Sequence, residues 1–136
     1  MDTATHYHMD KLWAKLVAHY AQHRCLKCGQ AGDDAHHWFY SRSIHKHRWN
    51  INNGVFLCRI CHQEAERDRE SMFKVIEKSD PKKWAWSQKL PPLISEPINP
   101  MAIRCLYASL KRTAVELGVI AKKPINVSKL ICRFPK

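Results

Sequence analysis

Four cysteines of this 136-residue chain form two Cys-x-x-Cys pairs, Cys25/Cys28 and Cys58/Cys61, with 29 residues between the pairs. Each pair can present two thiolates from one tight turn, and two pairs complete the tetrahedral ligand set that zinc prefers. A site of four thiolates has no open coordination position. The spacing therefore predicts a structural zinc ion that holds the intervening loop, and the alternative is four unligated thiols.

Histidines are concentrated between these pairs, because five of the nine lie in residues 36 to 62. His36 and His37 are adjacent on a predicted strand, so their side chains should point to opposite faces. Asn53 lies on the predicted return strand, and His62 directly follows the second cysteine pair. Hydrolysis of a phosphodiester needs a divalent cation on the phosphate and a base that activates water, and histidine suits the base. The segment contains the residue types for that reaction.

The pattern C-x2-C, H-H, N-x4-C-x2-C-H resembles the HNH (ββα-metal) endonucleases that carry a zinc knuckle. The resemblance implies that His37 is the general base and that Asn53 orients it through a hydrogen bond across the hairpin. It implies that His36 and His62 bind a catalytic Mg²⁺ or Mn²⁺ ion. Glu66, one turn after His62, is a candidate third ligand, and its alternative is an exposed helix carboxylate.

A narrower likeness is to the phage NinG/Rap-type recombination nucleases, in which a His is followed eleven residues later by Arg-aromatic-Asn-x-x-Asn. Here His37 is followed at that spacing by RWNINN, residues 48 to 53. The plan is also similar to the phage endonuclease VII junction resolvases. The likeness covers about residues 10 to 90 and departs at His62, where NinG/Rap proteins usually have Asn. It implies a phage- or prophage-encoded endonuclease, cytoplasmic in a bacterial host, that cuts branched or recombination-intermediate DNA.

Two other functions remain open from the sequence. One is a nicking or restriction-type HNH nuclease without preference for branched DNA. The other is a non-catalytic zinc-knuckle protein that binds nucleic acid.

The net charge of +11 indicates a polyanionic partner. It is concentrated in residues 97–136, with eight Lys and Arg against one Glu, whereas residues 1–96 have 15 against 11 Asp and Glu. A solvated basic tail is the alternative. The predicted DNA contacts are Arg42, Lys46, Arg48, Lys111, Arg112, Lys122 and Lys123. A structural salt bridge is the alternative for Arg48, and phosphate contact or solvation is expected for His45 and His47.

The elements that must position these residues follow from hydrophobic periodicity and breaker residues. The pattern predicts helices over 9–23, with Asp10 as N-cap, over 60–77, and over 101–117 with Gly118 as C-cap. Strands are predicted over 35–40 and 54–57. Ser79-Asp80-Pro81 indicates a stop or restart, before a short helix or turn over 82–90.

These elements predict a small α+β fold with N- and C-terminal flanking helices. The resemblance to the HNH endonucleases implies that its core is a ββα-metal unit stapled by the zinc knuckle. We expect a nuclease domain over 1–90, a Pro-rich linker over 91–100 and a basic helical region over 101–136. The helix over 101–118 is a candidate homodimer interface.

No apolar run reaches the roughly 18 residues of a membrane span, and the first residues lack the pattern of a secretory signal. The protein is therefore predicted to be cytosolic. Cysteines in that compartment are expected as metal ligands or free thiols. Cys105 and Cys132 belong to no paired motif and are predicted to be ordinary thiols.

Overall fold

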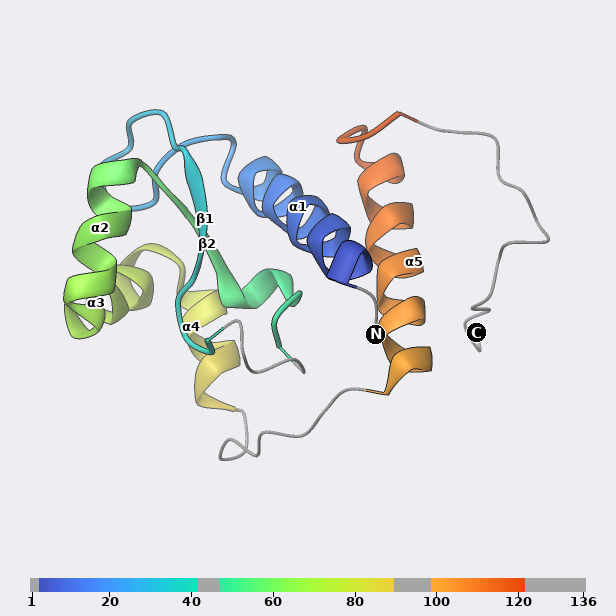
Figure 1. The fold of residues 1–136 in the computed structure, drawn as a ribbon. Coiled ribbons are helices and arrows are strands. Elements are labelled where there is room, and N and C mark those ends of the chain that lie inside the picture. The colour runs from blue at the N-terminus through green and yellow to red at the C-terminus, as the bar shows by residue number, and fades with distance from the viewer. Residues whose placement is uncertain (1–2, 42–46, 90–98, 122–136) are drawn as a thin grey trace.

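The computed structural model describes residues 3–41, 47–89 and 99–121, and a two-stranded antiparallel sheet lies between its helices (Figure 1). The elements along the chain are α1 (Thr3–Tyr20), β1 (Asp34–His37), the 3-10 turn η1 (Ile51–Asn53), β2 (Gly54–Leu57), α2 (Arg59–Arg67), α3 (Arg69–Ser79), α4 (Pro81–Gln88) and α5 (Pro100–Glu116). The described part of the chain is thus a small α+β fold, as predicted.

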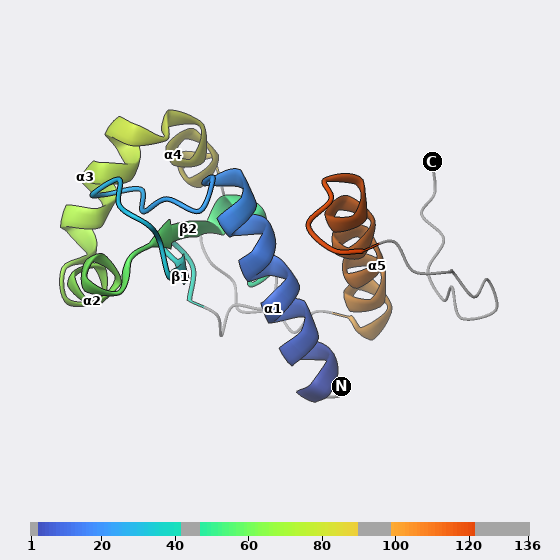
Figure 2. The ribbon, with the colours of Figure 1, turned by 90° about the horizontal axis from the view of Figure 1, so that it is seen from above.

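Strand β2 is buried on both faces, and two hydrophobic cores meet there. Val55 and Leu57 belong to a core with Trp38 and Ile76, whereas Phe56 belongs to a second core with α1 and α5. Alternate side chains of a strand point to opposite faces, so one short strand contributes to both cores. Figure 2 shows this order from above, with α2 and α3 on one side of the hairpin and α1, then α5, on the other.

The strands pair in the register Asp34↔Leu57, Ala35↔Phe56, His36↔Val55 and His37↔Gly54. The second strand has its predicted bounds, but the first ends at His37 rather than continuing to Tyr40. Beyond His37 the backbone no longer pairs with β2. The amides of Phe39 and Tyr40 donate instead to the side chain of Asn53, at 3.3 and 2.9 Å.

The helix predicted over 60–77 is two helices that meet at Asp68. Its backbone angles (φ −140°, ψ 86°) are not helical, and its carboxylate accepts from the amide of Ser71 at the start of α3. An Asp side chain that bonds the backbone in this way favours a cap over a helix interior. The predicted restart at 79–81 is confirmed, since α3 ends at Ser79 and α4 begins at Pro81.

Helix α1 begins at Thr3, so the prediction of Asp10 as its N-cap is wrong. Asp10 lies inside the helix and binds Arg48 and Trp49 instead. Helix α1 also carries apolar side chains that are fully or nearly fully buried, among them Met9, Leu16 and Trp13.

Helix α5 packs against α1 through Ile103, Leu110 and Ala114, on the side away from the sheet (Figures 1 and 2). Its apolar face is therefore used within the chain, although it was a candidate dimer interface. Asn99 is the N-cap of this helix, and its C-cap is Leu117 rather than the predicted Gly118, which follows directly in the left-handed conformation (φ 72°). The predicted linker lies largely outside the described residues.

Cys105 on α5 is disulfide-bonded, which contradicts the predicted free thiol. Cys132 lies outside the described residues. Among the described helices, none combines the length and the apolar character that crossing a membrane requires.

The close approach of α1 to β2 depends on Gly54. A Cβ added there would lie 2.5 Å from Val17 Cγ2 and 2.6 Å from Trp13 Cζ2. We expect Gly54→Ala to lower the free energy of unfolding by about 1–3 kcal/mol, because α1 must shift to make room. Urea denaturation checks this, with the exposed Glu77→Ala as a control that should change stability by less than about 0.5 kcal/mol. Equal stability of Gly54→Ala and the parent would contradict this packing.

Candidate metal sites and cleft

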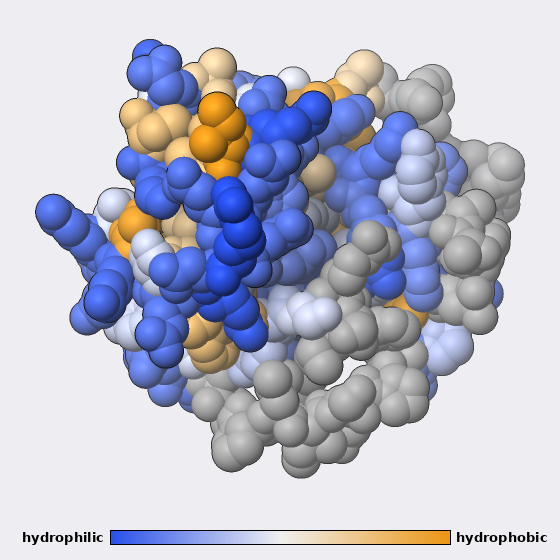
Figure 3. All heavy atoms as spheres, turned by 60° about the vertical axis from the view of Figure 1, so that its left-hand side comes forward, coloured by the Kyte–Doolittle hydropathy of each residue, from blue (hydrophilic) through white to orange (hydrophobic). Residues whose placement is uncertain are grey.

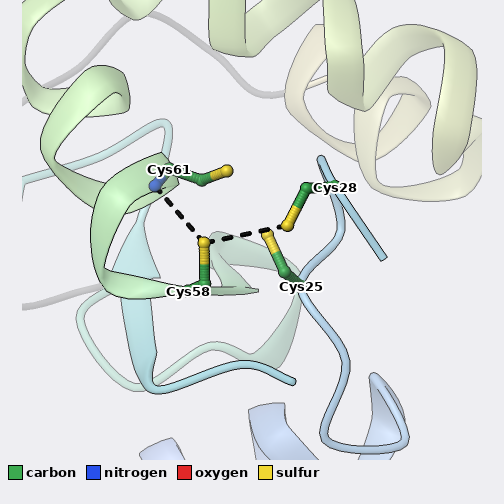
Figure 4. Close-up of side chains that lie close together, drawn as sticks. All are labelled: Cys25, Cys28, Cys58 and Cys61. Carbon is green, nitrogen blue, oxygen red and sulfur yellow. Dashed lines mark hydrogen bonds between the residues drawn. The ribbon is translucent and has the colours of Figure 1, made fainter. Parts of the chain in front are cut away.

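The four predicted cysteine ligands converge from two distant turns (Figure 4). Their sulfur atoms all lie within 4.8 Å of one another. In a tetrahedron with zinc–sulfur bonds of about 2.3 Å, the sulfurs are about 3.8 Å apart. The Sγ atoms of Cys28 and Cys58 are 3.8 Å apart. The cluster could therefore hold a metal such as zinc.

Local backbone structure explains why each pair presents its sulfurs together. The first turn closes at Gly29, whose φ is 77° and whose amide donates to the Cys25 carbonyl at 2.9 Å. The second pair begins α2, where Cys58 is the N-cap and its Sγ accepts from the amide of Cys61 at 3.5 Å.

Burial and hydrogen bonds affect the thiols of this cluster differently. Burial alone would raise the pKa of Cys25, but hydrogen bonds to the backbone of both cysteine turns lower it to about 7. Burial raises the pKa of Cys61. Since a metal binds the thiolate, this lowered pKa favours the ligand form of Cys25 near neutral pH.

A second set of potential ligands joins β1 to α2. Ligand atoms of His36, His62 and Glu66 lie within 4.8 Å of one another. The two imidazole rings are 4.9 Å apart between centroids, and Glu66 Oε1 is 3.3 Å from His62 Nε2. Burial, with the charges of His62, His37 and Arg69, lowers the pKa of His36 to about 4. A neutral imidazole is the form that binds a metal.

Asp34 supports this set, and the sequence analysis did not identify it. Its Oδ2 is 3.1 Å from Nδ1 of His62. A carboxylate that accepts from Nδ1–H leaves Nε2 as the ligand nitrogen, and Nε2 is the atom that lies beside Glu66. The signal was present in the sequence, because Asp34 precedes His36 by two residues and so shares its face of the strand.

His37 lies on the other face of β1 and has a different environment. Its ring stacks on Trp13, with 4.1 Å between centroids and 7° between planes. Its Nε2 is 2.7 Å from the carbonyl oxygen of Arg48. Since a carbonyl only accepts, Nε2 carries the proton, and Nδ1 is the acceptor nitrogen of the neutral ring.

Asn53 is predicted to orient the base across the hairpin. In the structure it binds backbone groups of neighbouring residues. Its carbonyl accepts from the amide of Trp38 at 3.2 Å, and its fully buried side chain donates to the carbonyls of Tyr40 and His47, at 2.9 and 3.2 Å. His47 precedes Arg48, whose carbonyl contacts the His37 ring. Asn53 thus helps to fix the segment that orients His37.

All four histidine and glutamate side chains border one cleft of about 580 Å³, although His36 and His37 point to opposite faces of β1. Helix α1 forms one wall of the cleft and α2 contributes the other. The lining residues are Asp10, Trp13, Ala14, Ala35, His36, His37, Ser41, His62, Ala65, Glu66 and Arg69. A candidate base and three candidate metal ligands therefore face a common space.

The predicted DNA contacts are placed unevenly. Arg48 is only 8% exposed, and its guanidinium binds Asp10 at 3.0 and 2.7 Å, which supports the salt-bridge alternative. Lys111 and Arg112 are exposed on α5, which α1 separates from the sheet (Figure 1). His47 stacks on Tyr40, 4.5 Å between centroids. Arg42, His45, Lys46, Lys122 and Lys123 lie outside the described residues.

Arg69 is a cation of the cleft that the sequence analysis missed. Its Nη2 donates to the carbonyl of Phe39 at 2.7 Å, and its side chain borders the cleft. No spacing rule pointed to it, because its contact with Phe39 joins residues that are 30 positions apart in the sequence.

The side of the molecule that carries α2 and α3 is mainly hydrophilic (Figure 3).

Comparisons with models of protein families, with curated proteins and with solved structures find no match to this chain. Functional conclusions therefore depend on the residues and their geometry.

We expect the purified protein to contain one tightly bound zinc ion per chain and Cys58→Ser to lose it. The variant should also unfold at lower denaturant concentration, because the free energy of metal binding contributes to folding. Zinc should leave as the pH falls, since protons compete for the thiolates. Metal analysis during gel filtration measures the content, and Ile60→Ala, an exposed neighbour, is the control. Four titratable thiols and no zinc after refolding with zinc would disprove the site.

Proposed function

We propose that this protein is a metal-dependent DNA endonuclease of the HNH type. One observation carries the proposal: the candidate ligands His36, His62 and Glu66 lie within 4.8 Å of one another, in the cleft that His37 also borders. The order β1, β2, α2 agrees with the ββα-metal unit that the sequence resembles, with the four-cysteine cluster joining its ends.

In this proposal His37 removes a proton from the attacking water through Nδ1. Its tautomer suits this role, because Nε2–H is held by the carbonyl of Arg48. His36 is kept neutral by burial, and Asp34 directs Nε2 of His62 toward the site. A divalent cation bound there would neutralise the scissile phosphate and stabilise the leaving oxygen.

The donor set gives an expectation about the metal. Two imidazole nitrogens and one carboxylate suit Mn²⁺ and later transition metals better than Mg²⁺, which prefers oxygen ligands. We therefore expect Mn²⁺ to support cleavage better than Mg²⁺, although the family resemblance implies either ion.

DNA is the proposed substrate because of charge and of the likeness to phage recombination nucleases. The chain carries a net charge of +11, and Arg69 borders the cleft. The NinG/Rap likeness extends the proposal to branched DNA. Neither argument alone distinguishes a junction nuclease from a nicking enzyme, so the first experiment includes both substrates.

The base assignment is tested with His37→Ala on supercoiled plasmid and on a synthetic four-way junction, in Mn²⁺ with and without chelator. We expect the variant to keep its zinc and its DNA affinity and to cut at least about 100-fold more slowly, because general base catalysis contributes on this scale. The control is His8→Ala, an exposed histidine outside the cleft.

Three results would test the base assignment and the choice between functions. Equal rates for His37→Ala and the parent would rule out His37 as the base. A parent that binds DNA but cuts neither substrate in Mn²⁺, Mg²⁺, Co²⁺ or Ni²⁺ would favour the non-catalytic zinc protein. Faster cutting of the junction than of a linear duplex of the same sequence would support the recombination role.

The metal assignment is tested with Glu66→Gln, which removes the charge but keeps the shape of the side chain. We expect the Mn²⁺ concentration for half-maximal cleavage to rise by about tenfold or more, with the structural zinc unchanged. Glu64→Gln is the matched control, because Glu64 lies two residues earlier on α2 and pairs with Lys27 at 2.7 Å. Identical Mn²⁺ dependence of both variants would exclude Glu66 as a ligand.

A further inference from the structure

We propose that α1 is part of the active site, with Asp10 acting as a positioning residue for His37 through Arg48 and with Trp13 fixing the plane of the His37 ring. The proposal deepens the proposed function and rests on His37 as the base. It gives a catalytic task to a helix outside the β1–β2–α2 unit.

The first of the contacts that link Asp10 to His37 is a bidentate ion pair between Asp10 and Arg48. Asp10 Oδ1 accepts from Nε of Arg48 at 3.0 Å, and Oδ2 accepts from Nη2 at 2.7 Å. Oδ1 also accepts from Nε1 of Trp49 at 2.8 Å. Two parallel bonds from a planar guanidinium fix its orientation as well as its distance. Asp10 therefore holds two successive residues, Arg48 and Trp49, of the segment 47–50.

The second contact joins that segment to the base. The carbonyl of Arg48, the residue that Asp10 holds by its side chain, lies 2.7 Å from Nε2 of His37. Asn53 holds the preceding carbonyl, that of His47, at 3.2 Å. The carbonyl that orients the base is thus fixed from both sides, by Asn53 within the hairpin and by Asp10 from α1.

Trp13 adds a second constraint from the same helix. Its indole is nearly parallel to the His37 ring, at 4.1 Å and 7°. Its Nε1 donates to the carbonyl of Asn50 at 2.8 Å, so the indole is held by the segment that Asp10 holds. Trp13 is 2% exposed. Helix α1 thus restrains the plane of the His37 ring through Trp13, and it restrains the direction of the Nε2–H bond through Asp10, together with Asn53.

Orientation matters here because a histidine has two nitrogens with opposite roles. If the Arg48 carbonyl shifts, Nε2–H loses its partner, and the ring can exchange tautomer or rotate. Nδ1 then accepts a proton in only part of the population, and a displacement of about 1 Å can slow a reaction by about 100-fold. A merely structural ion pair would instead affect stability alone.

The experiment compares two variants that remove this link. Asp10→Asn keeps the shape but leaves Arg48 buried without its charge partner. The double variant Asp10→Leu, Arg48→Met removes both charges, which avoids the large destabilisation of an unpaired buried charge. Glu64→Gln, which breaks an exposed ion pair of the same length, is the control. Metal content and denaturation verify folding before the other measurements.

Two readouts are taken on each protein. Long-range ¹H–¹⁵N spectra of the imidazoles report the tautomer of His37, assigned by the loss of its signals in His37→Ala. We expect a single Nε2–H tautomer in the parent and in Glu64→Gln, and a mixture in the double variant. In parallel, kcat for plasmid cleavage in Mn²⁺ should fall about 10- to 100-fold while KM changes by less than about threefold.

The outcomes separate this inference from the proposed function. A folded double variant with an unchanged His37 tautomer and unchanged kcat would overturn the inference and reduce Asp10 to a structural role. In another outcome, the parent fails to cut DNA while the double variant still changes the tautomer of His37. That result would support the positioning of His37 and refute the nuclease. A mixed tautomer in the parent itself would refute the inference directly.

Discussion

The pairing of β1 with β2 determines the positions of the candidate site residues, although a two-stranded hairpin of four residues per strand is not stable by itself in water. Its stability comes from outside the hairpin. Val55 and Leu57 pack into one core, and Phe56 packs into the other, so the strand is held from both faces. The four-cysteine cluster links the turn before β1 to the start of α2. Small displacements of α1 or of this cluster would therefore move the site.

The register of the hairpin divides the chemistry between its two faces. Asp34 and His36 share the face toward α2, where His62 and Glu66 lie. His37 is on the other face, against Trp13. A slip of one residue would exchange these faces and would separate the candidate ligands. Gly54, the pairing partner of His37, lets α1 come close at this position. Packing and candidate chemistry thus depend on the same register.

Motif spacing predicted the parts of the site that are local in sequence. The cysteine cluster, the return strand at 54–57 and the restart at Pro81 were all visible, because each depends on neighbouring residues. Asp10 was misassigned because an N-cap and an interior helix carboxylate are equally plausible at that position. Its true partners, Arg48 and Trp49, are 38 and 39 residues away, and only the packing of α1 brings them together. Arg48 was ambiguous for the same reason.

The arrangement around His37 explains why a carbonyl, rather than a carboxylate, contacts the ring. A carboxylate in direct contact would favour the charged imidazolium, which cannot accept a proton from water. A backbone carbonyl fixes the tautomer without adding a negative charge. Asp10 lies one step further away, and its charge is compensated by the guanidinium of Arg48. The side chain of Arg48 thus donates to the Asp10 carboxylate, and its neutral backbone carbonyl accepts from the His37 ring. This separation allows an acidic residue to hold a histidine in place without favouring the charged form of its ring.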